Sequence, residues 1–122
     1  MDIPPEISFT NVDTSPELEE RIHEKVARLE KIFDRLVACR VAVAYPHQHQ
    51  QHGNIPRIRI EMSVPGSHEL VVSHEPNHMQ EKYADPDITN ALNEAFKAAE
   101  RKLREYKEEL RDKERTPKES GL

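Results

Sequence analysis

The chain has 122 residues, of which 35% are hydrophobic and 34% are charged. This length allows one domain with one modest core, and the clear periods of its apolar residues favour a folded domain over a disordered chain. A formal net charge of −5 excludes a protein that is positively charged over its whole surface, although local clusters of cations are still compatible with RNA binding.

The sequence shows no targeting signal. No apolar run approaches the roughly 20 residues that cross a bilayer, and the first six residues lack the basic start and the apolar stretch of a signal peptide. Cys39 is the only cysteine, so a disulfide or a CxxC metal site cannot form within the chain. These features suit a reducing cytosol, and we expect a cytoplasmic protein without a membrane partner.

The first part of the chain predicts a strand and a long helix. Residues 7–11 alternate between apolar and polar side chains, as in a strand with one buried face. Ser15 and Pro16 are typical of a helix cap followed by proline at the first helical position. Apolar residues at three- and four-residue spacing then predict a helix over about residues 16–37. This apolar stripe consists of Leu18, Ile22, Val26, Leu29, Phe33 and Leu36.

Three further strands follow. Alternation with a period of two predicts strands over residues 39–45, 57–64 and 69–73. Between them lie two polar loops, over residues 46–56 and 76–85.

A second long helix ends the predicted domain. Asp85 and Pro86 repeat the pattern of a cap followed by proline. The apolar stripe of this helix consists of Ile88, Leu92, Ala95, Phe96, Ala99, Leu103, Tyr106 and Leu110. Because the stripe stops before Asp112, we expect one domain over residues 1–111 and a disordered tail over residues 112–122.

The order of these elements, β-α-β-β-β-α, predicts an α+β fold. Each strand has one apolar face and each helix has one apolar stripe, which favours a four-stranded, mostly antiparallel sheet with both helices packed on one face. The other face of the sheet carries Arg40, Arg57 and Arg59 and would meet solvent or a partner. The expected core includes Ile22, Val26, Leu29, Phe33, Ile58, Ile60, Leu92, Phe96 and Leu103.

Basic residues are segregated on both predicted helices. On the first helix they share one arc of about 120° and comprise Arg21, Lys25, Arg28, Lys31 and Arg35. On the second helix they share one flank, interrupted by Glu100 and Glu108, and comprise Lys97, Arg101, Arg104, Lys107 and Arg111. An ordinary solvated face with i,i+4 ion pairs is the simpler explanation from composition alone, and segregation by sign is an argument against it, because scattered surface pairs need not sort onto flanks.

The orientation of these flanks follows from an assumed topology. A sequential strand order and a right-handed connection through the first helix would place both basic flanks on the outer edges of the helical layer. The acidic residues would then face each other across the groove between the helices. These are Glu19, Glu30 and Asp34 on the first helix and Glu94, Glu105 and Glu109 on the second.

The sequence resembles the ribosome hibernation-promoting factors, which are also called ribosome-associated inhibitor or sigma-54 modulation proteins. The resemblance covers residues 6–110 and lies in the order of elements together with a set of short motifs. These are ARLEK at 27–31 with FD at 33–34, VPG at 64–66, DI at 87–88 with AL at 91–92, and ERKLR at 100–104. The chain is similar to a short, divergent form without the additional C-terminal domain of long members.

The resemblance implies a function without catalysis. Members of this family occupy the channel of the small ribosomal subunit, obstruct the messenger and transfer-RNA sites, and stabilise idle ribosomes. It therefore implies that the partners are the small subunit and its ribosomal RNA, with no cofactor and no small-molecule substrate, and a monomer when free. The RNA contacts that it implies are Lys25, Arg28, Lys31, Arg101, Arg104 and Lys107. The basic flanks add Arg35 and Lys97 to the expected RNA-binding residues.

The segment His47–His52 contains three histidines, His47, His49 and His52, which are weak candidates for a metal site. A flexible polar loop is the simpler interpretation, because no cysteine or nearby carboxylate completes a set of ligands. A contact with RNA that depends on pH is a third possibility.

No motif for catalysis is present. Cys39 lies on an inward strand face and is expected to be an inert core thiol, and no P-loop, GxGxxG or nucleophile elbow occurs. We therefore expect a translation-silencing factor that binds ribosomal RNA and is not an enzyme. The alternative is a metal- or protein-binding stress module that keeps the fold and no longer binds ribosomes.

Overall fold

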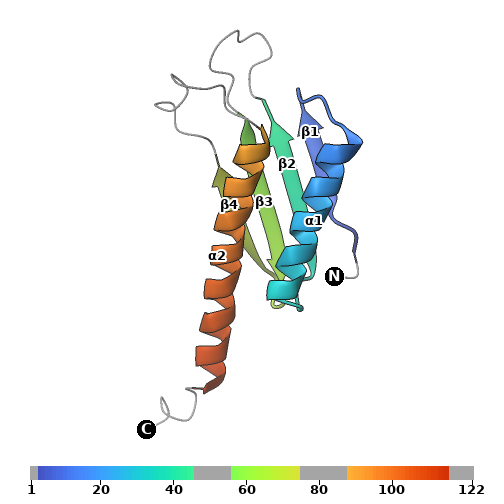
Figure 1. Ribbon diagram of the computed structural model, residues 1–122. Helices are drawn as coiled ribbons and strands as arrows, with labels where there is room; N and C mark the ends of the chain where they lie inside the picture. The colour runs from blue at the N-terminus through green and yellow to red at the C-terminus, as the bar shows by residue number, and fades with distance from the viewer. Residues whose placement is uncertain (1–2, 46–55, 75–87, 116–122) are drawn as a thin grey trace, which may run out of the picture.

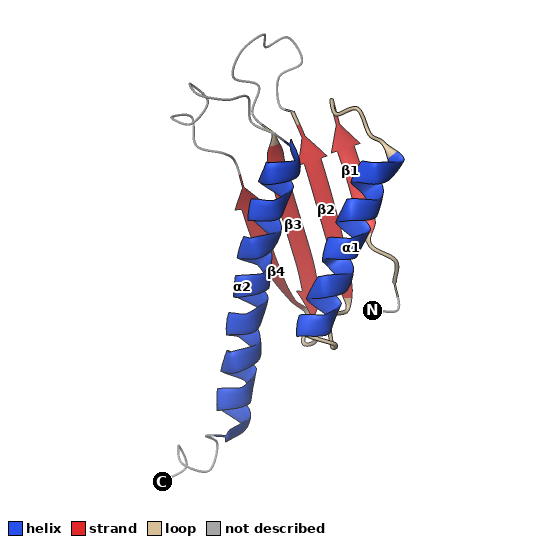
Figure 2. Ribbon diagram, viewed as in Figure 1, coloured by secondary structure: helices blue, strands red, loops and turns tan. Residues whose placement is uncertain are grey.

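Strands and helices follow the order that the sequence predicts. The computed structural model describes residues 3–45, 56–74 and 88–115. Its elements are β1 (Glu6–Thr10), α1 (Pro16–Ile32), β2 (Ala38–Ala44), β3 (Arg57–Val64), β4 (His68–His74) and α2 (Ile88–Arg115). Figure 2 shows these elements, and they confirm the predicted α+β fold.

The four strands form one sheet in the order β1-β2-β3-β4. β1 runs parallel to β2, whereas β3 is antiparallel to both of its neighbours, β2 and β4. The register aligns one inward row across the sheet, in which Ile7 lies opposite Val41, Val41 opposite Ile60, and Ile60 opposite Val72. Both helices cover this face of the sheet and run side by side (Figure 1).

The core lies between the sheet and the two helices. All nine residues expected there are at most 3% exposed, which confirms that part of the prediction. Cys39 is also buried, at 1% exposure, on the inward face of β2. The core thus joins the apolar stripes of both helices to the inward faces of β2, β3 and β4.

α1 begins as predicted but ends earlier. The Ser15 hydroxyl accepts a hydrogen bond from the Leu18 backbone N–H at 3.1 Å, and Pro16 is the first helical residue. The helix ends at Ile32, because Phe33 adopts an extended backbone and the chain turns toward β2. Phe33 and Leu36 are nevertheless buried, so the apolar stripe of the sequence continues through a turn that is not helical.

α2 extends further than its apolar stripe suggests. It reaches Arg115, so residues 112–115, which the sequence places in the tail, are helical. The predicted start of the helix at Asp85 and Pro86 and the rest of the tail lie outside the described residues. Along α2, Tyr106 packs edge-on against the ring of Phe33 with a centroid distance of 5.8 Å, which ties the end of α1 to the middle of α2.

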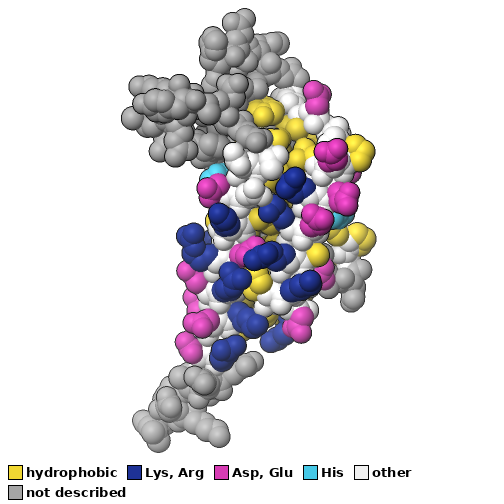
Figure 3. Space-filling model, viewed as in Figure 1, with side chains coloured by type: hydrophobic (Ala, Val, Ile, Leu, Met, Phe, Trp, Pro, Cys, Tyr) yellow, Lys and Arg dark blue, Asp and Glu magenta, His cyan; other side chains and the backbone are white. Residues whose placement is uncertain are grey.

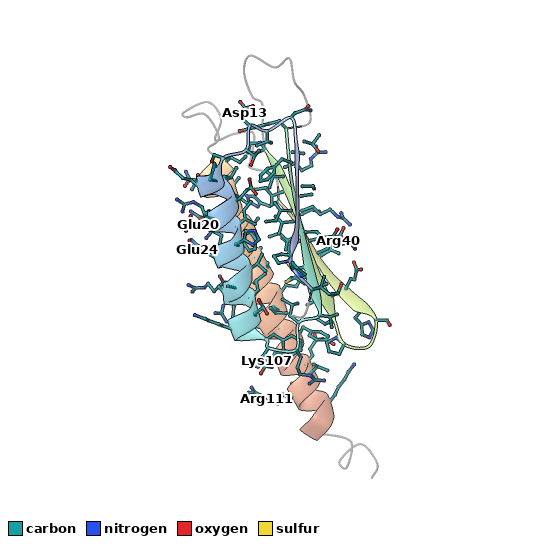
Figure 4. All side chains as sticks on the ribbon, turned by 90° about the vertical axis from the view of Figure 1, so that its right-hand side faces the viewer. Asp13, Glu20, Glu24, Arg40, Lys107 and Arg111 are labelled. Atoms are coloured by element: carbon teal, nitrogen blue, oxygen red, sulfur yellow. The ribbon has the colours of Figure 1, made fainter. Side chains whose placement is uncertain are left out.

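The connection from β1 through α1 to β2 is left-handed. In Figure 1 the helices lie in front of the sheet, β1 points upward at the right, and β2 lies to its left. Figure 4 confirms that both helices lie on one side of the sheet. A chain that rises along β1, descends in front and rises again to the left turns in a left-handed sense. The predicted right-handed connection is therefore wrong. β1 is a five-residue edge strand.

Candidate nucleic-acid interface

Basic side chains of α1 and α2 meet along the groove between the two helices. Arg28 Nε of α1 lies 2.9 Å from Glu100 Oε2 of α2, and Arg104 Nη1 lies 3.6 Å from Oε1 of the same carboxylate. Figure 3 shows Lys and Arg side chains gathered along the line between the helices, with most Asp and Glu toward the outer edges. The expected placement of the basic flanks on the outer edges is therefore wrong.

The left-handed connection explains this correction. Relative to the core stripe, the basic flank lies about 115° in one rotational sense on α1 and about 135° in the other on α2. In the left-handed arrangement, each helix lies on the opposite side of the other from the side expected. The same rotations therefore turn each basic flank toward the other helix. The predicted acidic groove, with Glu19, Glu30 and Asp34 facing Glu94, Glu105 and Glu109, is therefore wrong as well, because Arg28 of α1 and Glu100 and Arg104 of α2 meet there instead.

We call this surface the basic groove. It comprises Lys25, Arg28, Lys31, Lys97, Arg101, Arg104 and Lys107. One hollow of the groove lies between the helices, where Arg28 and Lys31 of α1 meet Arg104 of α2. A second hollow runs along α2 past Lys97 and Arg101. Exposed glutamates, Glu24, Glu105 and Glu108, also line these hollows.

Lys107 bridges the two helices where α1 ends. Its Nζ donates a hydrogen bond to the Ile32 backbone oxygen at 3.0 Å, and carbonyl groups at a helix C-terminus favour a nearby cation. Figure 4 shows Lys107 beside the end of α1 and Arg111 further along α2. Lys107 thus places a positive charge at the end of the basic groove that lies next to the C-terminus of α1.

Arg35 does not belong to the basic flank of α1, although the sequence places it there. The helix ends at Ile32, so Arg35 lies in the turn that follows. Its guanidinium carbon lies 5.9 Å from the centroid of the Phe33 ring, in a cation–π arrangement. Arg35 therefore lies near the end of α1 without continuing the helical arc.

Cations within the groove influence each other. The pKa of Lys25 is lowered, first by partial burial and next by the charge of Arg21, and Arg28 acts in the same direction. Glu100 opposes this shift. In the sequence, Glu100 is only an interruption of the basic flank, since no local signal shows that its carboxylate contacts a cation of the other helix.

The open face of the sheet has a different electrostatic character. Arg40 pairs with Glu61 at 2.7 Å and with Glu69 at 3.4 Å, and Arg59 pairs with Glu61 at 2.7 Å. Arg40 points away from the helices (Figure 4). The hydrogen bond from Arg59 is the main cause that lowers the pKa of Glu61, so this pairing stabilises the fold above the ordinary carboxyl pKa and is lost as pH falls. Acidic partners thus offset much of the positive charge on this face.

Cys39 is not a candidate nucleophile. Burial, with a smaller contribution from the charge of Glu30, raises the pKa of its thiol from 9.0 to about 12. The thiolate is the reactive form, and it is disfavoured on the inward face of β2. The expectation of a packed, inert core thiol is consistent with this environment.

We predict that Cys39 in the folded protein reacts with iodoacetamide at pH 8 roughly a thousandfold more slowly than a free cysteine. The reason is that a pKa of about 12, compared with 9.0, reduces the thiolate fraction by about that factor. Mass spectrometry of the alkylated protein over time measures the rate.

Unfolding in urea provides the control for this reaction, because it should restore the rate of a free thiol. A folded-state rate within tenfold of the unfolded one would contradict the buried environment.

The raised pKa of the Cys39 thiol also implies that the free energy of unfolding falls as pH rises above about 9, since the thiol ionises first in the unfolded chain.

The predicted metal candidates His47, His49 and His52 lie outside the described residues. Within residues 3–45, 56–74 and 88–115, no three side chains of His, Cys, Asp or Glu form a group that could hold a metal ion. In the same part of the chain, no helix is long and apolar enough to cross a membrane.

Two solved structures are similar in fold. The N-terminal domain of Protein Y from Thermus thermophilus is 19% identical, with a TM-score of 0.64 over 87% of this chain and 99% of that domain. A ribosomal subunit interface protein from Coxiella burnetii is 16% identical, with a TM-score of 0.63 over 84% of this chain and 96% of that protein. No curated protein is similar enough in sequence to count as a match.

The family assignment comes from the sequence itself. The model of the family described as sigma 54 modulation protein / S30EA ribosomal protein matches residues 6–111. This match covers every described strand and nearly all of α2, and the solved structures share the same fold. The chain therefore belongs to the sigma-54 modulation / S30EA ribosomal protein family, the ribosome hibernation family that its motifs resemble.

Proposed function

We propose that this protein silences translation by binding the RNA of the small ribosomal subunit through the basic groove. The observation that carries the proposal is the convergence of basic side chains from α1 and α2 on one groove, in a chain of the ribosome hibernation family. Neither helix alone forms this surface. The protein has a net charge of −5, so the concentration of cations in one place distinguishes this groove from the rest of the molecule.

The proposed contacts are the residues of the basic groove, with Arg35 beside the end of α1. Lysine and arginine next to phosphate groups release condensed counterions, which gives affinity without reading bases. Tyr106 is partly buried against Phe33, so the groove offers little aromatic surface on which bases could stack. The mode of binding that follows is recognition of the RNA backbone.

One copy of the chain supplies both walls of the groove. Arg28 and Lys31 come from α1, and Arg104 comes from α2 of the same chain. We therefore propose that the free protein acts as a monomer in the cytoplasm, where its ribosomal partner is found. This function needs no catalysis, because a protein bound in the channel of the small subunit would itself block translation.

We predict that the protein sediments with purified bacterial small subunits at low salt and is released as salt rises. If about four phosphates are neutralised, the affinity should fall roughly 50- to 150-fold between 50 and 200 mM salt. Sedimentation with a titration at both salt concentrations measures this change. An affinity that does not vary with salt would contradict phosphate contact, and no binding at the lower salt concentration would overturn the proposed function.

A further inference from the structure

The carboxylate of Glu100 lies at the floor of the basic groove, beneath the cations of both helices. Its side chain is 15% exposed, whereas the side chains of Arg28 and Arg104 are 66% and 57% exposed. Both oxygens are engaged, one by each arginine. An anion within the protein therefore already occupies the position between the two guanidinium groups.

Glu100 differs in this respect from the other acidic residues of the groove. Glu24, Glu105 and Glu108 are exposed, and exposed charges are screened by salt and water. Glu100 is partly withdrawn from solvent and reaches α1 and α2 together. Its negative charge acts on Lys25 as well, since it is the largest influence that raises the pKa of that lysine against burial and Arg21.

We propose that Glu100 is an internal competitor for phosphate that limits the affinity of the basic groove for nucleic acid. This inference rests on the proposed function and adds the residue that determines how tightly the groove binds. A phosphate that approaches Arg28 and Arg104 meets guanidinium groups already shared with a carboxylate, and it is repelled by that carboxylate. Binding then becomes weak enough to reverse, as release of an idle ribosome requires.

An opposite effect of Glu100 is possible in principle, because the carboxylate also orients the two arginines. Orientation by a surface ion pair changes an equilibrium roughly fivefold at most. A unit negative charge about 5 Å from a phosphate, in surroundings less polar than bulk water, changes it roughly tenfold or more. Repulsion therefore exceeds orientation, and removal of the charge should strengthen binding.

The test compares Glu100→Gln with Glu109→Gln. Both variants remove one negative charge from α2, but residue 109 is exposed and lies about 180° around the helix from residue 100. Affinity for purified bacterial small subunits is measured at several salt concentrations, and circular dichroism shows that each variant is folded. Glu100→Gln should bind roughly tenfold more tightly, and its dependence of log K on log salt should be steeper by about 0.7 to 0.9. Glu109→Gln should resemble the unchanged protein.

Each outcome has one meaning. Tighter and more salt-dependent binding by Glu100→Gln alone supports the internal competitor. Unchanged or weaker binding by Glu100→Gln, or an equal gain in Glu109→Gln, overturns it while the proposed function stands. If the unchanged protein and both variants fail to bind small subunits, the proposed function fails, and the role of Glu100 fails with it.

Discussion

Replacement of Phe96 with alanine should lower the free energy of unfolding by about 3–5 kcal/mol. Phe96 lies in the N-terminal third of α2, is 1% exposed and is among the largest fully buried side chains. Loss of the ring removes its transfer free energy and leaves a cavity that the paired strands and packed helices fill only in part. Urea denaturation followed by circular dichroism measures the change through the midpoint and slope of the transition.

Val37→Ala is the matched control for this experiment. Val37 is an apolar side chain of the same chain but is 44% exposed, and exposed substitutions usually change stability by about 0.5 kcal/mol or less. If Phe96→Ala cost no more than Val37→Ala, the ring could not lie in the closed core between α2 and the sheet.

Periodicity allowed much of the fold to be predicted because it reports which side chains are buried. The third strand was predicted over residues 57–64, and β3 has the same bounds. The same signal failed at the end of α1, where Phe33 and Leu36 keep the helical spacing in a turn. An apolar residue at helical spacing indicates a buried side chain, but it does not show whether the backbone at that position is helical.

The basic groove could be predicted in its residues but not in its geometry. Helical spacing sorts Arg28 and Lys31 onto one flank of α1, and Arg101 and Arg104 onto one flank of α2. Whether these flanks meet depends on the hand of the connection through α1, and no residue of the sequence reports that hand. The ion pair between Arg28 and Glu100 could be identified only from the three-dimensional structure. The same is true of the position of Glu100 beneath the cations.

Reversal of charge at two facing positions of the groove should nearly abolish binding to the small subunit. The double variant Arg28→Glu/Arg104→Glu replaces one cation on each helix, and each new carboxylate would also meet Glu100. Loss of two phosphate contacts, together with new repulsion, should weaken binding about a hundredfold or more at low salt. The slope of log K against log salt should become shallower by the contribution of about two phosphate contacts, because fewer counterions are released. Sedimentation with purified small subunits at several salt concentrations measures both quantities.

The control for this double variant is Lys102→Glu/Lys113→Glu, which changes the net charge by the same amount. Both lysines are exposed on α2 and lie more than about 150° around the helix from Arg104. Lys102 donates a hydrogen bond to the Val71 backbone oxygen at 3.0 Å, so it faces the edge of β4 and not the groove. If affinity depended only on overall charge, both double variants would weaken binding equally. If RNA lies along the groove, the control should retain most of its affinity and its salt dependence, and equal losses would exclude the groove as the binding surface.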